Sequence, residues 1–312
     1  MITLIMRRLA SLPFVIFSIT FITFTVGYLA PGDPILTMMG SRHDPVTYER
    51  LRHFYGLDLP WYQQYLNYMT GLAHGDLGLS FRYQGRPVWD LIRDGVPVSF
   101  ELGLAALSLS VFVGVPVGLL AALRQNSLVD RASTTLMLAL YSIPSFVLIP
   151  VLQWLNYQSY VRGGPSLPVA GWGRPEHWIM PVLVLSAASM GYIARLTRSS
   201  VVEVTRQDYI RTAYAKGLHE RRIDTMHIFR NAMLPVITVI GPSIAFLVTG
   251  AFVVENLFAI PGIGFLSVQA ISQRDYPVIQ STTVIVAIAV VMMNLVTDLL
   301  YTLLDPRVRV EA

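Results

Sequence analysis

YIRTAYAKGLHERRIDTMHIFRNAMLP, residues 209–235, is a long polar stretch between two membrane-length apolar runs. The preceding run ends at Ala194, and the following run starts at Ala232. The stretch is rich in arginine, and it contains Lys216, the only lysine of the chain. A polar loop of this length and pattern beside a membrane predicts a docking surface for another protein.

The first part of this stretch predicts a short helix. Ile210, Ala213, Tyr214 and Gly217 fall at i, i+3, i+4 and i+7, so they share one helical face. Because Ala213 and Gly217 are small, this face leaves room for the close approach of another surface, whereas Arg211 lies off it. Gly217 predicts the end of the helix. The alternative interpretation is an ordinary solvated loop that keeps its basic residues in the cytosol.

The composition predicts an all-α integral membrane protein. Of the 312 residues, 54% are hydrophobic and 13% are charged, and the mean hydropathy is +0.54. A soluble domain carries roughly 25% charged residues. The chain has no cysteine, which excludes a disulfide framework and a thiolate metal site. Its six histidines are scattered, so we expect no metal site. We also expect no cofactor in this chain and no nucleic-acid partner.

Six apolar runs predict six transmembrane helices in a single membrane domain that spans residues 1–312. The first run has 22 uncharged residues, which at ~1.5 Å each span a bilayer of ~30 Å and exceed the ~7–15 residues of a signal-peptide core. We therefore expect a retained helix rather than a cleaved signal. The six helices are predicted at about 9–30, 102–123, 133–155, 178–197, 236–254 and 276–300.

Proline, glycine and charges interrupt the chain between the first two helices. Residues 31–97 are therefore predicted to form an extracytoplasmic insertion. Within it, short helices are expected at 46–54 and 61–72, with a third at 88–92 lying along the membrane surface. In the third transmembrane helix, Pro144 and Pro150 predict kinks.

The distribution of basic residues predicts the orientation. The segments assigned to the cytosol hold 14 of the 23 arginines and lysines, although they are much shorter than the outside loops. This excess places both termini and the loop 203–235 in the cytosol.

Five motifs in chain order resemble binding-protein-dependent ABC importer permeases of the dipeptide/oligopeptide/nickel branch. Residues 209–235 resemble the EAA motif loop in the variant Y-I-R-T-A-x-A-K-G-L, with Arg211 and Thr212 in place of the Glu and the first Ala of the general form. The loop also has a longer spacer before its closing Leu234-Pro235. The other motifs are LAPGDP at 29–34, HGDLGLS at 74–80, ENLF and IPGIG within 255–264, and LLDPR at 303–307.

This resemblance implies a B-type permease subunit with the type I ABC importer transmembrane-domain fold, in the prokaryotic cytoplasmic (inner) membrane. Its implied partners are membrane lipid, a second homologous permease in a heterodimer, two ABC ATPase subunits that bind ATP and Mg, and an extracytoplasmic substrate-binding protein. In the family, the EAA loop forms a coupling helix in a groove of the ATPase subunit. The coupling residues expected here are Tyr209, Ile210, Arg211, Ala213, Tyr214, Lys216 and Gly217.

The implied function is peptide transport by an importer subunit that is not itself an enzyme. The chain contains no G-x-x-x-x-G-K-[ST] sequence, so we expect it not to hydrolyse ATP. Nickel, glutathione and oligosaccharide importers of the same family remain alternatives. A stand-alone secondary transporter or channel is disfavoured, because no charged residue lies near the middle of a predicted helix. A structural membrane anchor is a third alternative.

Neutral polar side chains on the predicted helices could line a transport pathway. Their alternative role is hydrogen bonding between helices. The candidates are Ser142, Ser145, Gln153, Ser186, Ser189, Ser243, Thr249 and Asn294.

Overall fold

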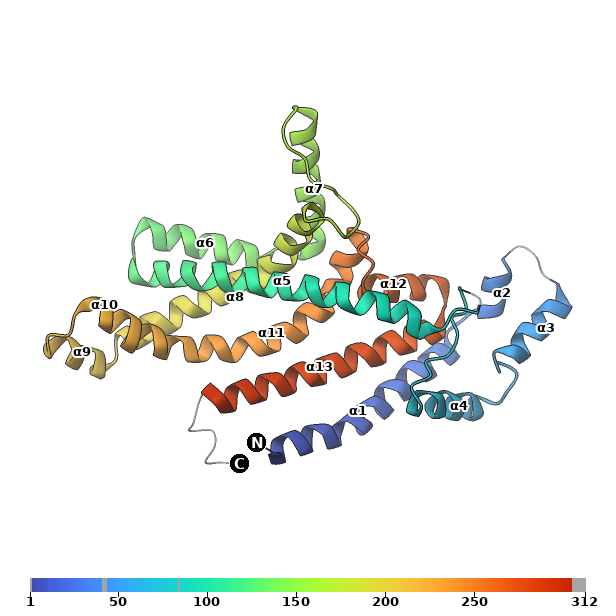
Figure 1. Ribbon diagram of the computed structural model, residues 1–312. Coiled ribbons are helices and arrows are strands. Elements are labelled where there is room, and N and C mark those ends of the chain that lie inside the picture. The colour runs from blue at the N-terminus through green and yellow to red at the C-terminus, as the bar shows by residue number, and fades with distance from the viewer. Residues whose placement is uncertain (1, 41–43, 84, 305–312) are drawn as a thin grey trace. The chain divides into compact units, whose positions relative to one another are not determined.

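The computed structural model describes residues 2–40, 44–83 and 85–304, and every regular element in them is a helix (Figure 1). The chain divides into two compact units, which we describe separately. Unit 1 comprises Phe100–Ala259 and the chain from Met292 on, and unit 2 comprises Ile2–Ser99 and Ile260–Val291. The longer helices are α1 (Ile2–Leu29), α5 (Val88–Leu123), α6 (Leu128–Ser142), α7 (Ser145–Val161), α8 (Glu176–Thr205), α11 (Arg230–Leu257) and α13 (Tyr276–Leu304). The shorter ones are α2 (Pro34–Met39), α3 (Pro45–Phe54), α4 (Trp61–Ala73), α9 (Asp208–Ala215), α10 (Glu220–Arg222), the π-helix η1 (Ile223–Phe229) and α12 (Ile263–Gln273).

Several of these helices are long and apolar enough to cross a membrane. Among the described residues, four helical segments have the length and composition of a membrane span: Ala10–Leu29, Val88–Leu123, Glu176–Thr205 and Tyr276–Leu299. Helices α6 and α7 together form a fifth, bent candidate. The predicted all-α, multi-pass architecture is therefore confirmed. The count of six spans and the cytosolic position of the termini stay predictions.

Helix α5 is longer than the predicted helix 102–123. It begins at Val88 and continues through Pro97, so residues 88–92 form its first turns and not a separate surface helix. Gly95 packs against the backbone of Gly262, and the Ser99 hydroxyl accepts a hydrogen bond from the Ile263 N–H at 2.8 Å. The start of α12 thus holds this part of α5 in place. Packing of this kind overrides the boundary that Pro97 suggested.

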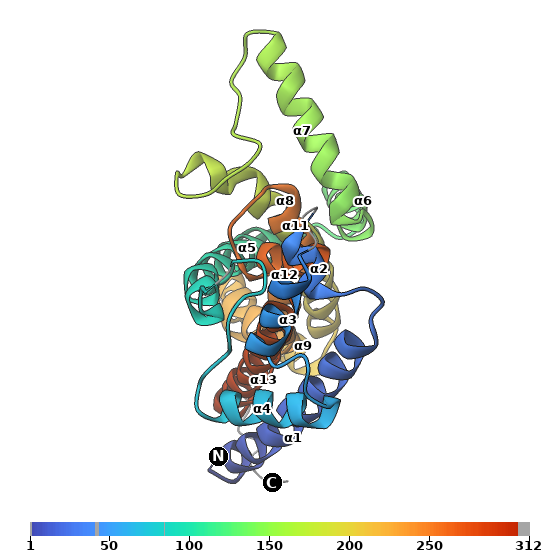
Figure 2. The same cartoon turned by 90° about the vertical axis from the view of Figure 1, so that its right-hand side faces the viewer.

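The predicted helix 133–155 is broken rather than kinked. Helices α6 and α7 meet at an angle of 109°, and α7 runs away from α6 in both views (Figures 1 and 2). Ile143 between them is extended, with φ −82° and ψ 118°. Proline disfavours the helical conformation of the residue before it, which explains a break at Pro144. Pro150 lies inside α7 without ending it.

Helix α8 is at the centre of unit 1 and packs closely against its neighbours. A Cβ atom on Gly118 of α5 would lie 2.3 Å from the carbonyl oxygen of Ala194 on α8. A Cβ atom on Gly191 of α8 would lie 2.4 Å from the carbonyl oxygen of Met137 on α6. Small residues allow such close approach of helices, as is common in membranes. The backbones of α5, α6 and α8 are therefore in direct contact.

In unit 2, a buried aspartate fixes the loop that follows α4. The Asp275 side chain accepts hydrogen bonds from the Ser80 hydroxyl at 2.5 Å and from the backbone N–H groups of Phe81 and Arg82 at 3.0 and 3.1 Å. An apolar cluster lies beside it and contains Leu77, Val88, Ile92, Ile263, Ala270 and Val278. This cluster and Asp275 join α5, α12 and α13 to the loop.

Candidate functional site

The candidate site begins where α8 ends. Gln207 is extended, with ψ 146°, so the chain leaves α8 and turns into α9 at Asp208. Asp208 lies in the first turn of α9, where a negative charge stabilises the helix N-terminus. It also lies 3.4 Å from Arg211 in an exposed ion pair, which contributes about 0–1 kcal/mol.

Helix α9 ends at Ala215, and Gly217 closes its C-terminus, as the sequence predicts. Gly217 has φ +72°, a conformation that glycine adopts readily. The Leu218 N–H donates to the Ala213 carbonyl, and the Gly217 N–H donates to the Tyr214 carbonyl. This hydrogen-bond pair is the Schellman arrangement that closes many helices. Leu218 also packs against the apolar cluster beneath α9.

The inner face of α9 packs against this chain. Ile210 is 1% exposed and Ala213 is 6% exposed, and both belong to a buried cluster with Val201 of α8 and with Ile223 and Ile228 of η1. The helical pattern of the sequence predicts that Ile210 and Ala213 lie on a face open to a partner. That interpretation is wrong for these two side chains, because the nearest apolar surface that can bury them is their own chain.

The outer face of α9 is exposed. Tyr209 and Tyr214 are 44% and 48% exposed. Exposed tyrosines beside arginine are typical of residues that dominate protein interfaces. Partial burial, followed by the nearby Asp224 and Glu220, raises the pKa of the Tyr214 phenol. We call the exposed set the coupling surface; it comprises Tyr209, Arg211, Thr212, Tyr214, Lys216 and Gly217.

After α9, a π-helix carries the chain into α11. Segment η1 buries Ile223 and Ile228 beneath α9 and leaves Met226 exposed. Burial and the nearby Glu220 raise the pKa of the Asp224 carboxyl. Short π-helical segments occur frequently at functional sites. The sequence predicts an amphipathic segment here, but a 3.6-residue hydrophobic period does not distinguish an α-helix from the wider π-helix.

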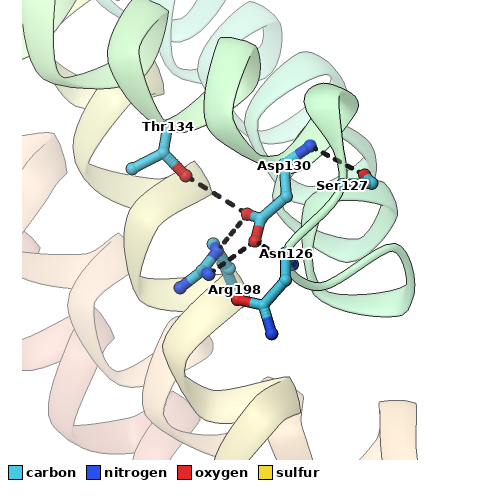
Figure 3. A network of polar contacts seen from close by, with 5 residues as sticks. All are labelled: Asn126, Ser127, Asp130, Thr134 and Arg198. Carbon is cyan, nitrogen blue, oxygen red and sulfur yellow. Dashed lines mark hydrogen bonds and ion pairs between the residues drawn. The ribbon is translucent and has the colours of Figure 1, made fainter.

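A network of polar contacts joins α6 to α8 (Figure 3). Arg198 binds the Asp130 carboxylate through Nε at 2.5 Å and through Nη2 at 2.8 Å. The same carboxylate accepts hydrogen bonds from the Asn126 N–H at 2.9 Å and from the Thr134 hydroxyl at 3.3 Å. Such bidentate, charge-assisted contacts are strong. They hold the end of α8 that leads into the coupling surface.

Asp130 is not among the site residues predicted from the sequence, although the sequence carries a local signal for it. Ser127 and Asp130 have the spacing of a capping box, with the serine at the N-cap and the acidic residue three positions later. The Ser127 hydroxyl does accept from the Asp130 N–H at 3.2 Å. The Asp130 carboxylate binds Arg198 instead of the N-cap backbone, and the residues around Asp130 in the sequence do not reveal this contact with a residue 68 positions away.

The candidate pathway residues lie in several environments. Ser186 and Ser189 are buried in unit 1, and the Ser110 hydroxyl of α5 donates to the Ser186 carbonyl at 3.2 Å. Their position fits the alternative role, contact between helices. Ser142 is exposed at the end of α6, and the half-buried candidates are Ser145, Gln153 and Asn294. The side chains of Ser243 and Thr249 lie outside the described residues.

The site has the chemistry of a docking surface. Across the described ranges, no three acidic or histidine side chains gather where they could hold a metal ion. The coupling surface offers two tyrosines and two positive charges, Arg211 and Lys216, on a short helix fixed from beneath. Such an arrangement can bind a partner and transmit its movement.

Known proteins resemble this chain over its whole length. A family described as binding-protein-dependent transport system inner membrane component matches residues 114–310, and the N-terminal membrane component of the same system matches residues 1–103. The dipeptide transport system permease protein DppB of Bacillus subtilis (strain 168) is 41% identical over 305 residues, which cover 98% of this chain and 97% of that protein. DppB of Escherichia coli (strain K12) is 37% identical over 337 residues, covering 99% of each.

A solved structure shows the same fold. The MetNI methionine ABC transporter, solved in inward facing conformations, matches with a TM-score of 0.57 and 17% identity, over 69% of this chain and 96% of that chain. At this identity the likeness shows the fold alone, and it confirms the predicted transmembrane-domain fold of ABC importers. From the family matches and from relatives that align end to end, the chain belongs to the family of binding-protein-dependent transport system inner membrane components.

Proposed function

We propose that this inner-membrane transport subunit forms half of the translocation pathway of an ATP-driven peptide importer, and that the coupling surface binds the ATPase subunit. The observation that carries the proposal is the division of α9 into two faces. Ile210 and Ala213 fix the helix to α8 and η1, while Tyr209 and Tyr214 are exposed. A helix held in this way can bind a partner and pass its movement to the membrane helices.

Peptides are the proposed substrate because of the names of the relatives. DppB of two species is a dipeptide permease, and the oligopeptide permease OppB of Haemophilus influenzae (strain ATCC 51907 / DSM 11121 / KW20 / Rd) is 39% identical over 305 residues, covering 97% of each protein. Nickel, glutathione and oligosaccharides are the alternative substrates. Uptake of labelled dipeptide, nickel, glutathione and oligosaccharide by cells with and without this gene separates them. Dipeptide uptake that does not depend on the gene would refute the proposal.

The proposed assembly contains several partners. A binding protein delivers the substrate, two ATPase subunits bind ATP and Mg, and a second homologous permease completes the pathway as a heterodimer. The family name itself states the dependence on a binding protein. The ATPase is assigned to separate subunits because this chain has no phosphate-binding P-loop sequence.

The contacts in unit 1 supply a route for coupling. A displacement of Tyr209 and Tyr214 by the ATPase moves α9, and the buried cluster beneath α9 transmits this movement to the end of α8. Arg198, two turns before that end, transmits it to Asp130 and α6. Switching of the pathway between outward and inward access is then a rigid-body allosteric change.

Two substitutions at Gly217 test the coupling surface. A Cβ atom at this position would meet no atom of the chain within 4 Å, and φ is +72°. Asparagine adopts positive φ far more readily than most residues, so Gly217→Asn is the matched control for Gly217→Trp. We expect Gly217→Trp to remain in the membrane, to lose co-purification of the ATPase and to abolish peptide uptake, while Gly217→Asn retains both. Arg211→Ala should have a smaller effect, because its ion pair is exposed.

Two results with these variants would contradict binding of the ATPase at the coupling surface. Wild-type uptake and wild-type ATPase recovery with Gly217→Trp would show that no partner approaches Gly217. Loss of the Gly217→Trp protein from the membrane would leave Tyr214→Ala as the second variant, since Tyr214 is 48% exposed and lies outside the buried cluster. A Tyr214→Ala protein that recovers the ATPase fully would exclude the coupling surface as its docking site.

A further inference from the structure

Unit 2 contains a cavity that the proposed coupling mechanism does not use. Its volume is about 550 Å³, and it lies among the end of α1, helices α2–α4, the loop after α4 and the start of α13. This volume is within the range of sites for small molecules. The lining is rich in tyrosine, with Tyr28, Tyr48, Tyr55, Tyr68 and Tyr276. The predicted topology places this cavity on the extracytoplasmic side.

One of these tyrosines, Tyr68, has a buried hydroxyl that no described residue pairs with. By contrast, the Tyr48 hydroxyl donates to Asp33 at 2.6 Å, and the Tyr55 hydroxyl donates to the Ser80 carbonyl at 3.4 Å. Buried hydroxyl groups are rarely left unpaired. Burial raises the pKa of the Tyr68 phenol, so it is a hydrogen-bond donor at neutral pH.

Three side-chain amides line the same cavity, and one of them, Gln64, donates to the carbonyls of Leu57 and Leu59. The other two are Gln280 and Asn67. Gln280 is 9% exposed, and Asn67 lies one position before Tyr68. Neither of these two amides makes a side-chain hydrogen bond to another described residue. An amide offers both donors and an acceptor, which complement the N–H and C=O groups of a peptide bond. A phenol and two amides around one cavity therefore favour a ligand that contains peptide bonds.

The cavity also carries charges of both signs. One oxygen of Asp76 accepts a hydrogen bond from the Gly78 N–H at 2.8 Å, and the other oxygen makes no hydrogen bond to a described residue. The Arg52 guanidinium has a 4.0 Å ion pair with Glu49 and is 43% exposed. A carboxylate and a guanidinium complement the ammonium and carboxylate groups of a short peptide with free ends.

We propose that this cavity is a reception site for short peptides with free termini. Tyr68, Asn67 and Gln280 bind the peptide backbone, while Asp76 and Arg52 bind its two ends. The proposal rests on the proposed function of peptide import. It adds a binding site that belongs to this subunit and precedes the membrane pathway.

The test measures peptide binding to the membrane complex without the substrate-binding protein. The complex of permease and ATPase subunits is placed in lipid nanodiscs, and the probe is radiolabelled alanyl-phenylalanine. Tyr68→Phe removes only the unpaired hydroxyl, and we expect it to weaken binding on the order of tenfold. Tyr62→Phe, on the exposed side of α4 and outside the cavity, is the matched control and should bind as the wild type does. The same dipeptide with acetylated and amidated ends should bind more weakly.

Three results would overturn the reception site. They are an absence of dipeptide binding to the wild-type complex, equal dipeptide binding by the Tyr68→Phe and Tyr62→Phe complexes, and equal binding of the free and the end-blocked dipeptide by the wild-type complex. Dipeptide uptake by the complete wild-type system is measured in parallel. If the complete system imports the dipeptide but one of these results is found, only the reception site is refuted. If the complete system imports no dipeptide, the proposed function is refuted.

Discussion

Substitution of Asp130 by asparagine tests how strongly the polar network fastens α6 to α8. The carboxylate is 5% exposed and accepts hydrogen bonds from Arg198, Asn126 and Thr134. An asparagine has nearly the same shape, but it supplies only one acceptor oxygen and no charge. Arg198, which is 27% exposed, then loses its bidentate partner.

The expected loss of stability follows from this burial. Removing one partner of a buried ion pair costs about 3–5 kcal/mol. Because water still reaches part of the Arg198 guanidinium, we expect a decrease of about 2–3 kcal/mol in the free energy of unfolding. The double variant Asp130→Asn/Arg198→Gln removes both charges, so its loss should be smaller than the sum of the two single losses.

The assay is unfolding of the purified subunit in mixed micelles of mild detergent and dodecyl sulfate. Asp94→Asn is the matched control, because Asp94 pairs with Arg86 at 3.6 Å and is 76% exposed. We expect this control to lose less than about 1 kcal/mol. If Asp130→Asn loses no more stability than Asp94→Asn, or if the two single losses add fully in the double variant, the Asp130–Arg198 pair does not fasten α6 to α8.

Three further predictions concern the contacts of Asp275 in unit 2, the membrane topology and the lack of ATPase activity of the chain. Asp275→Ala removes the acceptor for Ser80, Phe81 and Arg82, and it should cost about 3 kcal/mol and expose this loop to protease; an unchanged digestion pattern would contradict this role. Single cysteines at Gln63 and Thr225 of this cysteine-free chain should react differently with an impermeant reagent in intact cells, with labelling only at 63. Labelling at 225 would invert the predicted topology. The purified subunit alone should show no ATPase activity, and hydrolysis that persists without partners would oppose the assigned role.

The helical membrane fold and the end of α9 could be predicted from sequence because they depend on local properties. Long uncharged runs can cross a bilayer only as helices or closed barrels, and Gly217 supplies a conformation that other residues adopt at a cost. Which of two prolines breaks the predicted helix 133–155 could not be read from the local sequence. Pro144 and Pro150 have the same intrinsic effect, yet the chain breaks only at the first, and α7 continues through the second.

Two features could not be predicted from the sequence, for a different reason. They are which face of α9 is buried and the contacts of Asp275 in unit 2. A helical period shows which residues share a face, but not whether that face contacts the same chain or another one. Ile210 and Ala213 are buried by residues of η1 and α8. Asp275 and Ser80 are 195 positions apart, so nothing in either local sequence reveals their contact.

The glycine contacts of α8 have a mechanical consequence. Where Gly118 and Gly191 bring backbone against backbone, no side chain can change rotamer to absorb a displacement. The three helices that meet there cannot slip past one another in small steps, and they shift together as one stiff body. A displacement of one end of α8 therefore reaches its other end with little internal deformation. A methyl group at either glycine would force the helices apart, and part of the displacement would then be lost within the loosened contact.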